Sequence, residues 1–128
     1  MDSECGAKIV RVRIEYLDQN ESFARYLPLS GRATRTLLES DGRRWWVVEL
    51  DQSFGYQHLV KAPFQFRQIQ VSEIVIGNRW QGHEVGESEP TSVHILLPLV
   101  DSATAGNTLR PDDFQAVAWG TCHAEAAT

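Results

Sequence analysis

Residues 31–50 read GRATRTLLESDGRRWWVVEL, and this stretch decides the fold class. Two runs rich in β-branched and aromatic residues flank Asp41 and Gly42, a dipeptide that tolerates the positive φ angles of a tight turn. The pattern predicts an antiparallel β-hairpin. With a two-residue loop, Leu38 is expected to face Trp45 across the two strands.

Alternation along this hairpin separates a more apolar face from a less apolar one. The first face, assigned to the core with Arg35 as its exception, carries Ala33, Leu37, Trp46, Val48 and Leu50. The second face carries Thr34, Thr36, Leu38, Trp45 and Val47. This second face is still apolar for a solvated surface, which indicates cover by another segment of the chain or by a partner.

Period-two alternation continues on both sides of the hairpin. It predicts further strands at 8–17, 72–80 and 92–100. Residues 114–122 are favoured as a strand over a short helix. Residues 51–71 match neither pattern over a useful length and are interpreted as a long excursion with one short strand near 64–69. Residues 82–90 and 101–113 are expected to be loops, because they are polar and contain Gly or Pro.

Five or more strands with little helix predict an all-β fold. We expect a small antiparallel sandwich or a partly open barrel of five to seven strands. The 128 residues are enough for one domain. We expect a single β domain over residues 8–123, with a flexible N-terminus at 1–7 and a flexible C-terminus at 124–128.

Composition limits the classes of partner and the compartment. The chain has 17 acidic and 12 basic residues, a net charge of −5, which excludes a uniformly basic nucleic-acid or lipid binder. No apolar run reaches the roughly 18 residues of a membrane span, and the first residues do not resemble a secretory signal. A soluble, cytoplasmic protein is expected, in which Cys5 and Cys122 are reduced thiols.

The net charge conceals two unlike parts of the chain. Residues 8–79 contain 11 basic and 8 acidic residues, whereas residues 80–128 contain one basic and seven acidic residues. Arginine and tryptophan are also neighbours twice, at 43–46 and at 79–80. A local basic and aromatic patch is therefore compatible with an acidic total.

These features support two binding hypotheses, both non-enzymatic. The first is a protein–protein interaction module, either an inhibitor or immunity-type protein or a self-associating subunit such as a homodimer. Its binding face would comprise Thr34, Leu38, Trp45 and Val47. The alternative is a single-stranded nucleic-acid-binding β-barrel, because phosphates require cations and bases require flat faces. Its patch would comprise Arg35, Arg43, Arg44, Trp45, Arg79 and Trp80.

Catalytic and metal-binding signals are weak. The chain has no GxSxG, P-loop or HExxH motif. A third, lesser hypothesis is a small enzyme or metal-binding protein centred on His83 with Glu84. A metal site would require His83, His94, Cys122 and His123 to converge. Because neighbouring residues of a strand point to opposite faces, Cys122 and His123 cannot form a catalytic pair there. No cofactor and no metal are expected.

Overall fold

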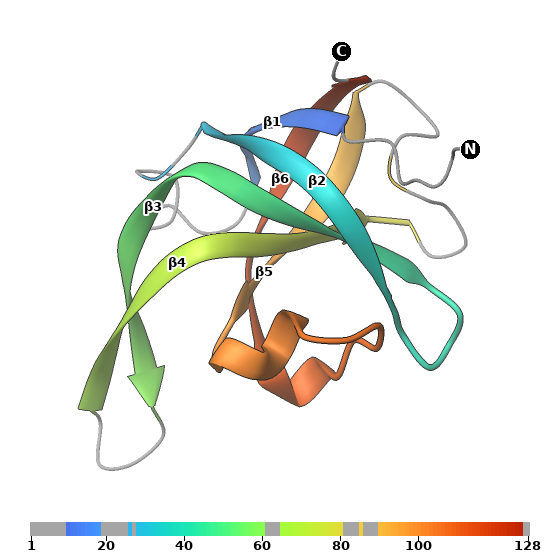
Figure 1. Cartoon of the computed structure of the whole chain (residues 1–128). Helices are drawn as coiled ribbons and strands as arrows, with labels where there is room; N and C mark the ends of the chain where they lie inside the picture. The colour runs from blue at the N-terminus through green and yellow to red at the C-terminus, as the bar shows by residue number, and fades with distance from the viewer. Residues whose placement is uncertain are drawn as a thin grey trace.

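The computed structural model describes residues 10–18, 26, 28–60, 65–80, 85 and 90–126. Within them, six antiparallel strands form a closed barrel in sequence order (Figure 1). The strands are β1 (Val10–Asp18), β2 (Leu29–Leu38), β3 (Arg44–Val60), β4 (Gln65–Asn78), β5 (Thr91–Pro98) and β6 (Phe114–Ala126). The prediction of a small all-β fold is confirmed, as is the strand favoured at 114–122. The barrel closes because β1 pairs with β6 as well as with β2.

Helix is limited, in the described part of the chain, to two single 3-10 turns. These are η1 (Asp101–Thr104) and η2 (Pro111–Asp113), both between β5 and β6. Neither is a helix that could cross a membrane. The first nine residues lie outside the described ranges, so the expectation for 1–7 does too. At the other end, β6 extends to Ala126.

The barrel interior holds the larger of two apolar clusters. In β1, Val12 and Ile14 are buried while Arg13 between them is exposed, as alternation predicts. The other strands contribute Val48, Val71, Ile74, Ile76, Val93, Ile95, Leu97 and Ala118, among others. Burial of this cluster is the main force that closes the barrel.

The turn between β2 and β3 is one residue longer than predicted. The amide of Glu39 donates to the carbonyl of Arg43 at 2.8 Å, and the amide of Gly42 donates to the carbonyl of Glu39 at 2.8 Å. Gly42 has φ of 92°. This is a three-residue hairpin loop that ends in a left-handed glycine. Asp41 supports the turn, since its Oδ1 accepts from the Arg43 amide at 2.8 Å.

The longer loop changes the register of the hairpin. Leu37, not Leu38, pairs with Trp45, so the predicted pairing was wrong. The register shifts again between Ala33 and Arg35, a β-bulge that places these two residues on opposite faces. Leu37 and Arg35 therefore leave the core face that alternation assigned to them.

Within residues 51–71, the described residues 51–60 and 65–71 form a long two-stranded ribbon. The strand predicted near 64–69 is present within β4, but the interpretation of the rest as an irregular excursion was wrong. β3 and β4 pair from Phe54 with Val71 as far as Val60 with Gln65. Gly55 lies within this ladder and does not interrupt it. In Figure 1 the ribbon extends beyond the other strands of the barrel. The strands here are stabilised by pairing between β3 and β4, although their sequences do not alternate between apolar and polar residues.

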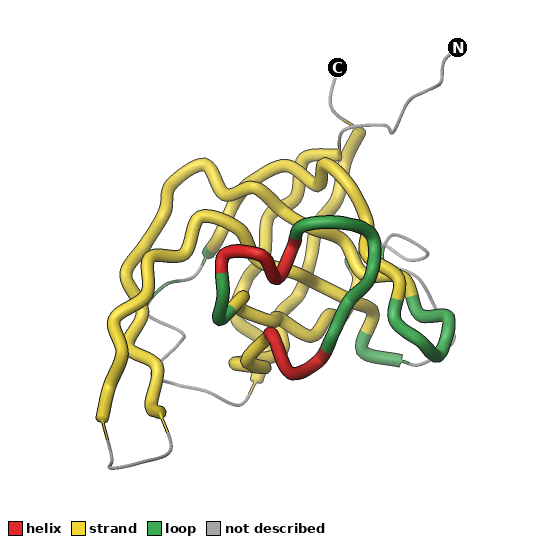
Figure 2. Tube along the Cα trace, turned by 60° about the horizontal axis from the view of Figure 1, so that its bottom comes forward, coloured by secondary structure: helices red, strands yellow, loops and turns green. Residues whose placement is uncertain are grey.

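Residues 100–113, here called the cover segment, cross in front of the barrel strands in Figure 2. They contribute Ala103 and Leu109 to the second apolar cluster. The cluster comprises Leu37, Trp45, Val47, Val75, Leu96, Ala103, Leu109 and Phe114. The segment is tied to β2 by two backbone hydrogen bonds, from Leu38 to the Asn107 carbonyl at 2.7 Å and from Leu109 to the Leu38 carbonyl at 3.0 Å. The chain itself therefore covers much of the surplus apolar face of the hairpin.

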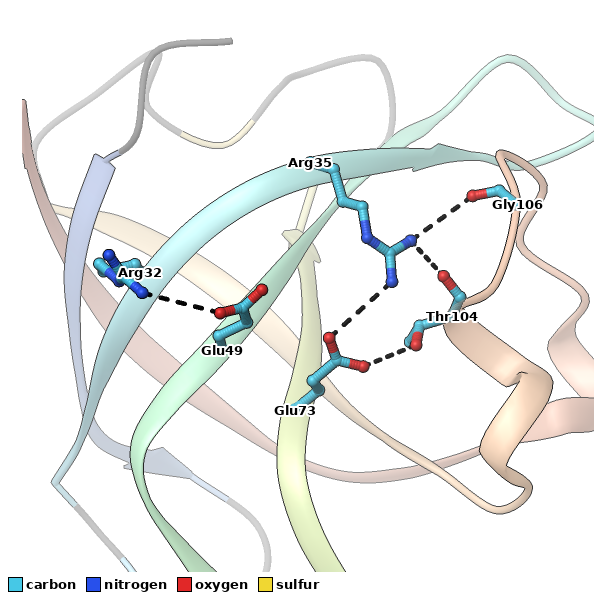
Figure 3. A network of polar contacts seen from close by, with 6 residues as sticks. All are labelled: Arg32, Arg35, Glu49, Glu73, Thr104 and Gly106. Carbon is cyan, nitrogen blue, oxygen red and sulfur yellow. Dashed lines mark hydrogen bonds and ion pairs between the residues drawn. The ribbon is translucent and has the colours of Figure 1, made fainter.

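A polar network also holds the cover segment (Figure 3). The Arg35 guanidinium donates to the carbonyl of Thr104, with the carbonyl of Gly106 at 3.5 Å, and lies 3.8 Å from the Glu73 carboxylate. The Thr104 hydroxyl donates to the same carboxylate at 2.6 Å. Arg35 thus serves as a structural cation beneath the segment.

Candidate functional site

A row of aligned positions crosses four strands on the outside of the barrel. The positions are Trp45 in β3, Gly77 in β4, His94 in β5 and Trp119 in β6. Gly77 pairs with His94, and His94 pairs with Trp119. Trp45 is one residue from Trp46, which pairs with Ile76, so Trp45 lies beside Gly77. The interior cluster contains a sequence neighbour of each of the last three positions: Ile76 beside Gly77, Ile95 beside His94 and Ala118 beside Trp119. The row therefore faces away from the core.

Gly77 provides the space in which Trp45 lies. A Cβ added at Gly77 would overlap the six-membered ring of Trp45, so the indole rests directly on the backbone of β4. The indole is 5% exposed, and its Nε1 donates to Glu39 Oε1 at 3.0 Å. Trp45 is thus a fixed, largely buried base of the row.

His94 lies between the two tryptophans. Its ring centroid is 6.4 Å from that of Trp45 and 5.7 Å from that of Trp119, with the latter pair edge to face. Trp119 Nε1 donates to His94 Nδ1 at 2.7 Å. Because an indole N–H can only donate, Nδ1 of His94 must be unprotonated in this arrangement.

The surroundings of His94 favour the neutral imidazole. Burial lowers the pKa of His94 from its usual 6.5, and the charges of Arg43 and Arg79 lower it further. A hydrogen bond with the backbone of Arg79 acts in the opposite direction. The pKa is lowered overall, which favours the uncharged ring at neutral pH.

Two arginines lie against the aromatic rings. Arg43 Cζ is 5.3 Å from the centre of the Trp45 ring. Arg79 Cζ is 3.8 Å from the Trp119 ring and 5.1 Å from the Trp80 ring. Guanidinium groups stack on indole through cation–π attraction and still expose their N–H edges. Trp80 is the most open part of the site, with 61% of its surface exposed.

Arg43 and Arg79 differ from most of the other arginines in their ion pairing. Five arginines in the described ranges each lie within 4 Å of a carboxylate: Arg11 with Asp51, Arg13 with Glu15, Arg32 with Glu49, Arg35 with Glu73 and Arg110 with Asp113. Arg43 and Arg79 have no such partner among the residues that the structure describes. The Nε atom of Arg43 is also buried without a hydrogen-bond acceptor. The site therefore presents two cations that the described part of the chain does not neutralise.

The structure brings together four of the six residues predicted for nucleic-acid binding. Arg43 and Trp45 approach from the β2–β3 turn, and Arg79 and Trp80 follow β4. Arg35 is elsewhere, beneath the cover segment. Arg44 is exposed, at the first position of β3.

The four residues predicted for protein binding do not form one open surface. Leu38 is 49% exposed and Thr34 is partly buried. Trp45 and Val47 are buried, at 5% and 0% exposure, in the cluster beneath the cover segment. The protein-binding hypothesis remains a prediction, but two of its four residues are not accessible to a partner.

The structure describes only some of the histidines and cysteines considered as catalytic or metal-binding residues. His83 and Glu84 lie outside the described residues, so the third hypothesis does too. Cys122 is buried in the barrel interior, whereas His123 is partly exposed and lies 3.5 Å from Glu15. The prediction that these neighbours face opposite ways is confirmed. Among the described residues, no group of three potential metal ligands converges.

Sequence reasoning missed His94 and Trp119 as members of the site. Alternation in 92–100 already placed His94 on the face opposite Val93 and Ile95. The missing information was that β5 pairs with β6 in the register that sets His94 beside Trp119. A long-range register of this kind leaves no local signal.

No family model matches the chain, and searches of curated proteins and of solved structures also find no match. Two cavities, of about 310 and 440 Å³, lie elsewhere, beside Glu73 and beside Asp51. The residues that line them include none of the aromatic row. In the row Trp45 and Gly77 are buried, whereas His94 and Trp119 are partly exposed, as are the neighbouring Arg43 and Arg79.

Proposed function

We propose that the protein binds single-stranded nucleic acid on the platform formed by Arg43, His94, Trp119, Arg79 and Trp80. The observation that carries this proposal is the pair of arginines, each held against an indole and neither paired with a carboxylate in the described chain. A phosphodiester would supply the missing negative charge in a geometry that suits a guanidinium. An unstacked base would supply a flat face for the exposed ring of Trp80.

Single strands are favoured over duplexes for a geometrical reason. Bases within a duplex are stacked on each other and cannot stack on Trp80, whereas bases of a single strand can be splayed out. The negative total charge of the chain does not oppose this, because the attraction is local. Glu39, the carboxylate that contacts the row, is engaged by the indole N–H of Trp45 at 3.0 Å.

The number of cations sets the expected salt dependence. Neutralising two phosphates of a single strand gives a slope of log K against log salt of about −1.4. This is far shallower than the slope of an extensively basic binder. A slope of this size is therefore a signature of the two-arginine site.

A matched pair of double variants tests the proposal. The first replaces the two unpaired arginines (Arg43→Gln with Arg79→Gln), and the control replaces two exposed, carboxylate-paired ones (Arg13→Gln with Arg32→Gln). Both lower the charge by two. Binding of a labelled thymidine octamer is measured by fluorescence anisotropy from about 20 to 200 mM salt.

The first double variant is expected to lose at least tenfold in affinity and most of its salt dependence, because hydrogen bonds to charged groups contribute about 1.5–3 kcal/mol each. The control is expected to retain both. Trp80→Ala should weaken binding about 5- to 150-fold, corresponding to 1–3 kcal/mol of base stacking. An equal loss in the two double variants would show that total charge alone is responsible and would refute the proposal.

A protein partner or a second copy of the chain is the other candidate occupant of this surface. It is favoured by the exposed Trp80 beside Arg79, since Trp and Arg are enriched among interface hot spots. Light scattering after size-exclusion chromatography distinguishes self-association. A mass that rises with concentration and falls to the monomer value in Trp80→Ala would favour a homodimer over the nucleic-acid site.

A further inference from the structure

We infer that His94 is a positioning residue of this platform, whose neutral imidazole holds Trp119 and, through Trp119, the guanidinium of Arg79. This inference rests on the proposed function of the site. It goes further by stating that ligand binding requires one protonation state of His94. It also predicts that acidification releases the ligand.

The hydrogen bond between the two rings carries the argument. Trp119 Nε1 donates to His94 Nδ1 at 2.7 Å, which fixes the rotation of the indole relative to β5. Arg79 lies over that indole, with its Cζ 3.8 Å from the ring centre. The position of the guanidinium therefore depends on the indole, and the position of the indole depends on a lone pair of His94.

Protonation of His94 removes that lone pair. Nδ1 then carries a hydrogen that points at the N–H of Trp119, so two donors would face each other at hydrogen-bond distance. One ring has to turn away, and Arg79 loses the surface on which it lies. Simple electrostatics predicts the opposite outcome, because an added positive charge would strengthen anion binding. The sign of the pH effect therefore separates positioning from charge.

The charged groups around His94 reinforce its neutral form. In the described chain these are Arg43, just before β3, and Arg79, just after β4. The facing position on β4 is Gly77, and the facing residue on β6 is Trp119, so neither adds a charge. Burial of the ring acts in the same direction as the two arginines.

The test is a pH profile of binding measured by calorimetry with an unlabelled thymidine octamer, between pH 5.5 and 8 at constant salt. Neither thymine nor the phosphodiester titrates in that range. For the native chain, the dissociation constant is expected to rise as pH falls, approaching about tenfold per pH unit below the midpoint of the His94 titration. His94→Gln can still accept from Trp119 but does not titrate. It should bind within about threefold of the native chain at pH 8 and show no pH dependence.

Two further variants distinguish positioning from other effects. His94→Leu cannot accept a hydrogen bond and should bind weakly at every pH. His123→Gln removes another partly exposed histidine, one that lies near Glu15, and should retain the native profile. The indole N–H resonance of Trp119, followed without ligand, should move with the His94 titration in the native chain and stay constant in His94→Gln.

The outcomes separate the inference from the proposed function. Affinity that increases toward acid, or a profile that His94→Gln leaves unchanged, overturns the positioning role while nucleic-acid binding stands. A Trp119 resonance that does not follow pH also overturns it. Absence of octamer binding at every pH overturns the proposed function and the inference with it.

Discussion

The cover segment decides whether Trp45 and Val47 are core or surface, and Leu109→Ala tests this directly. Leu109 is 3% exposed and packs in the second apolar cluster, so truncation removes three buried carbons and leaves a cavity. Leu→Ala changes in protein cores cost about 2–5 kcal/mol. Because the segment can settle partly into the gap, we expect a loss of about 2–3 kcal/mol in the free energy of unfolding.

The matched control is Leu38→Ala. Leu38 is bonded to the same segment through its backbone, but its side chain is 49% exposed, so we expect a loss below about 1 kcal/mol. Urea denaturation at pH 7, followed by tryptophan fluorescence, measures both variants. A loss below about 0.5 kcal/mol for Leu109→Ala, with an unchanged denaturant slope, would refute the packing of Leu109 in the second apolar cluster. Trp45 would then be available to a partner after all.

Three further predictions concern other parts of the barrel. Gly77→Ala should destabilise the fold by about 1–3 kcal/mol in the same urea assay and shift the emission of Trp45, because the added methyl displaces the indole; unaltered emission would contradict this. Burial lowers the pKa of His94 below its usual 6.5, so the unfolded chain binds a proton at higher pH than the folded chain does. His94 therefore does not affect the free energy of unfolding above pH 6.5 and lowers it as pH falls below 6.5. His94→Gln should remove this decrease of stability below pH 6.5. The hydrogen bonds from Arg11 lower the pKa of Asp51 from its usual 3.8. This pair therefore stabilises the fold above pH 3.8, and the stabilisation is lost as pH falls below 3.8. Asp51→Asn should make the free energy of unfolding less dependent on pH below 3.8, and an acid-unfolding curve identical to that of the native chain would argue against the pair.

Local patterns were sufficient to predict the strands whose two faces differ in polarity. Residues 8–17 alternate clearly because one face of β1 lies in the interior and the other carries Arg13 and Glu15. Residues 51–71 have no such contrast, and the long ribbon there was missed. The loop at Asp41 and Gly42 was identified as a turn, but its length was not.

The platform could be predicted only in part for the same reason. Neighbouring arginine and tryptophan residues in the sequence indicated Arg43 and Arg79. They could not indicate His94 and Trp119, which reach the site through the pairing of β5 with β6. Nor could they show that Arg35 forms an ion pair with Glu73 and a hydrogen bond with the cover segment.

The sequence by itself determined an acidic chain whose alternating strands require a β fold, because side chains alternate faces along every strand. It also determined that the hairpin carries more apolar surface than one core can use. Only the tertiary structure decided what covers that surface and which arginines keep their charge unpaired. Both depend on strand registers, bulges and contacts between residues far apart in the chain, and a shift of one residue in register exchanges the two faces.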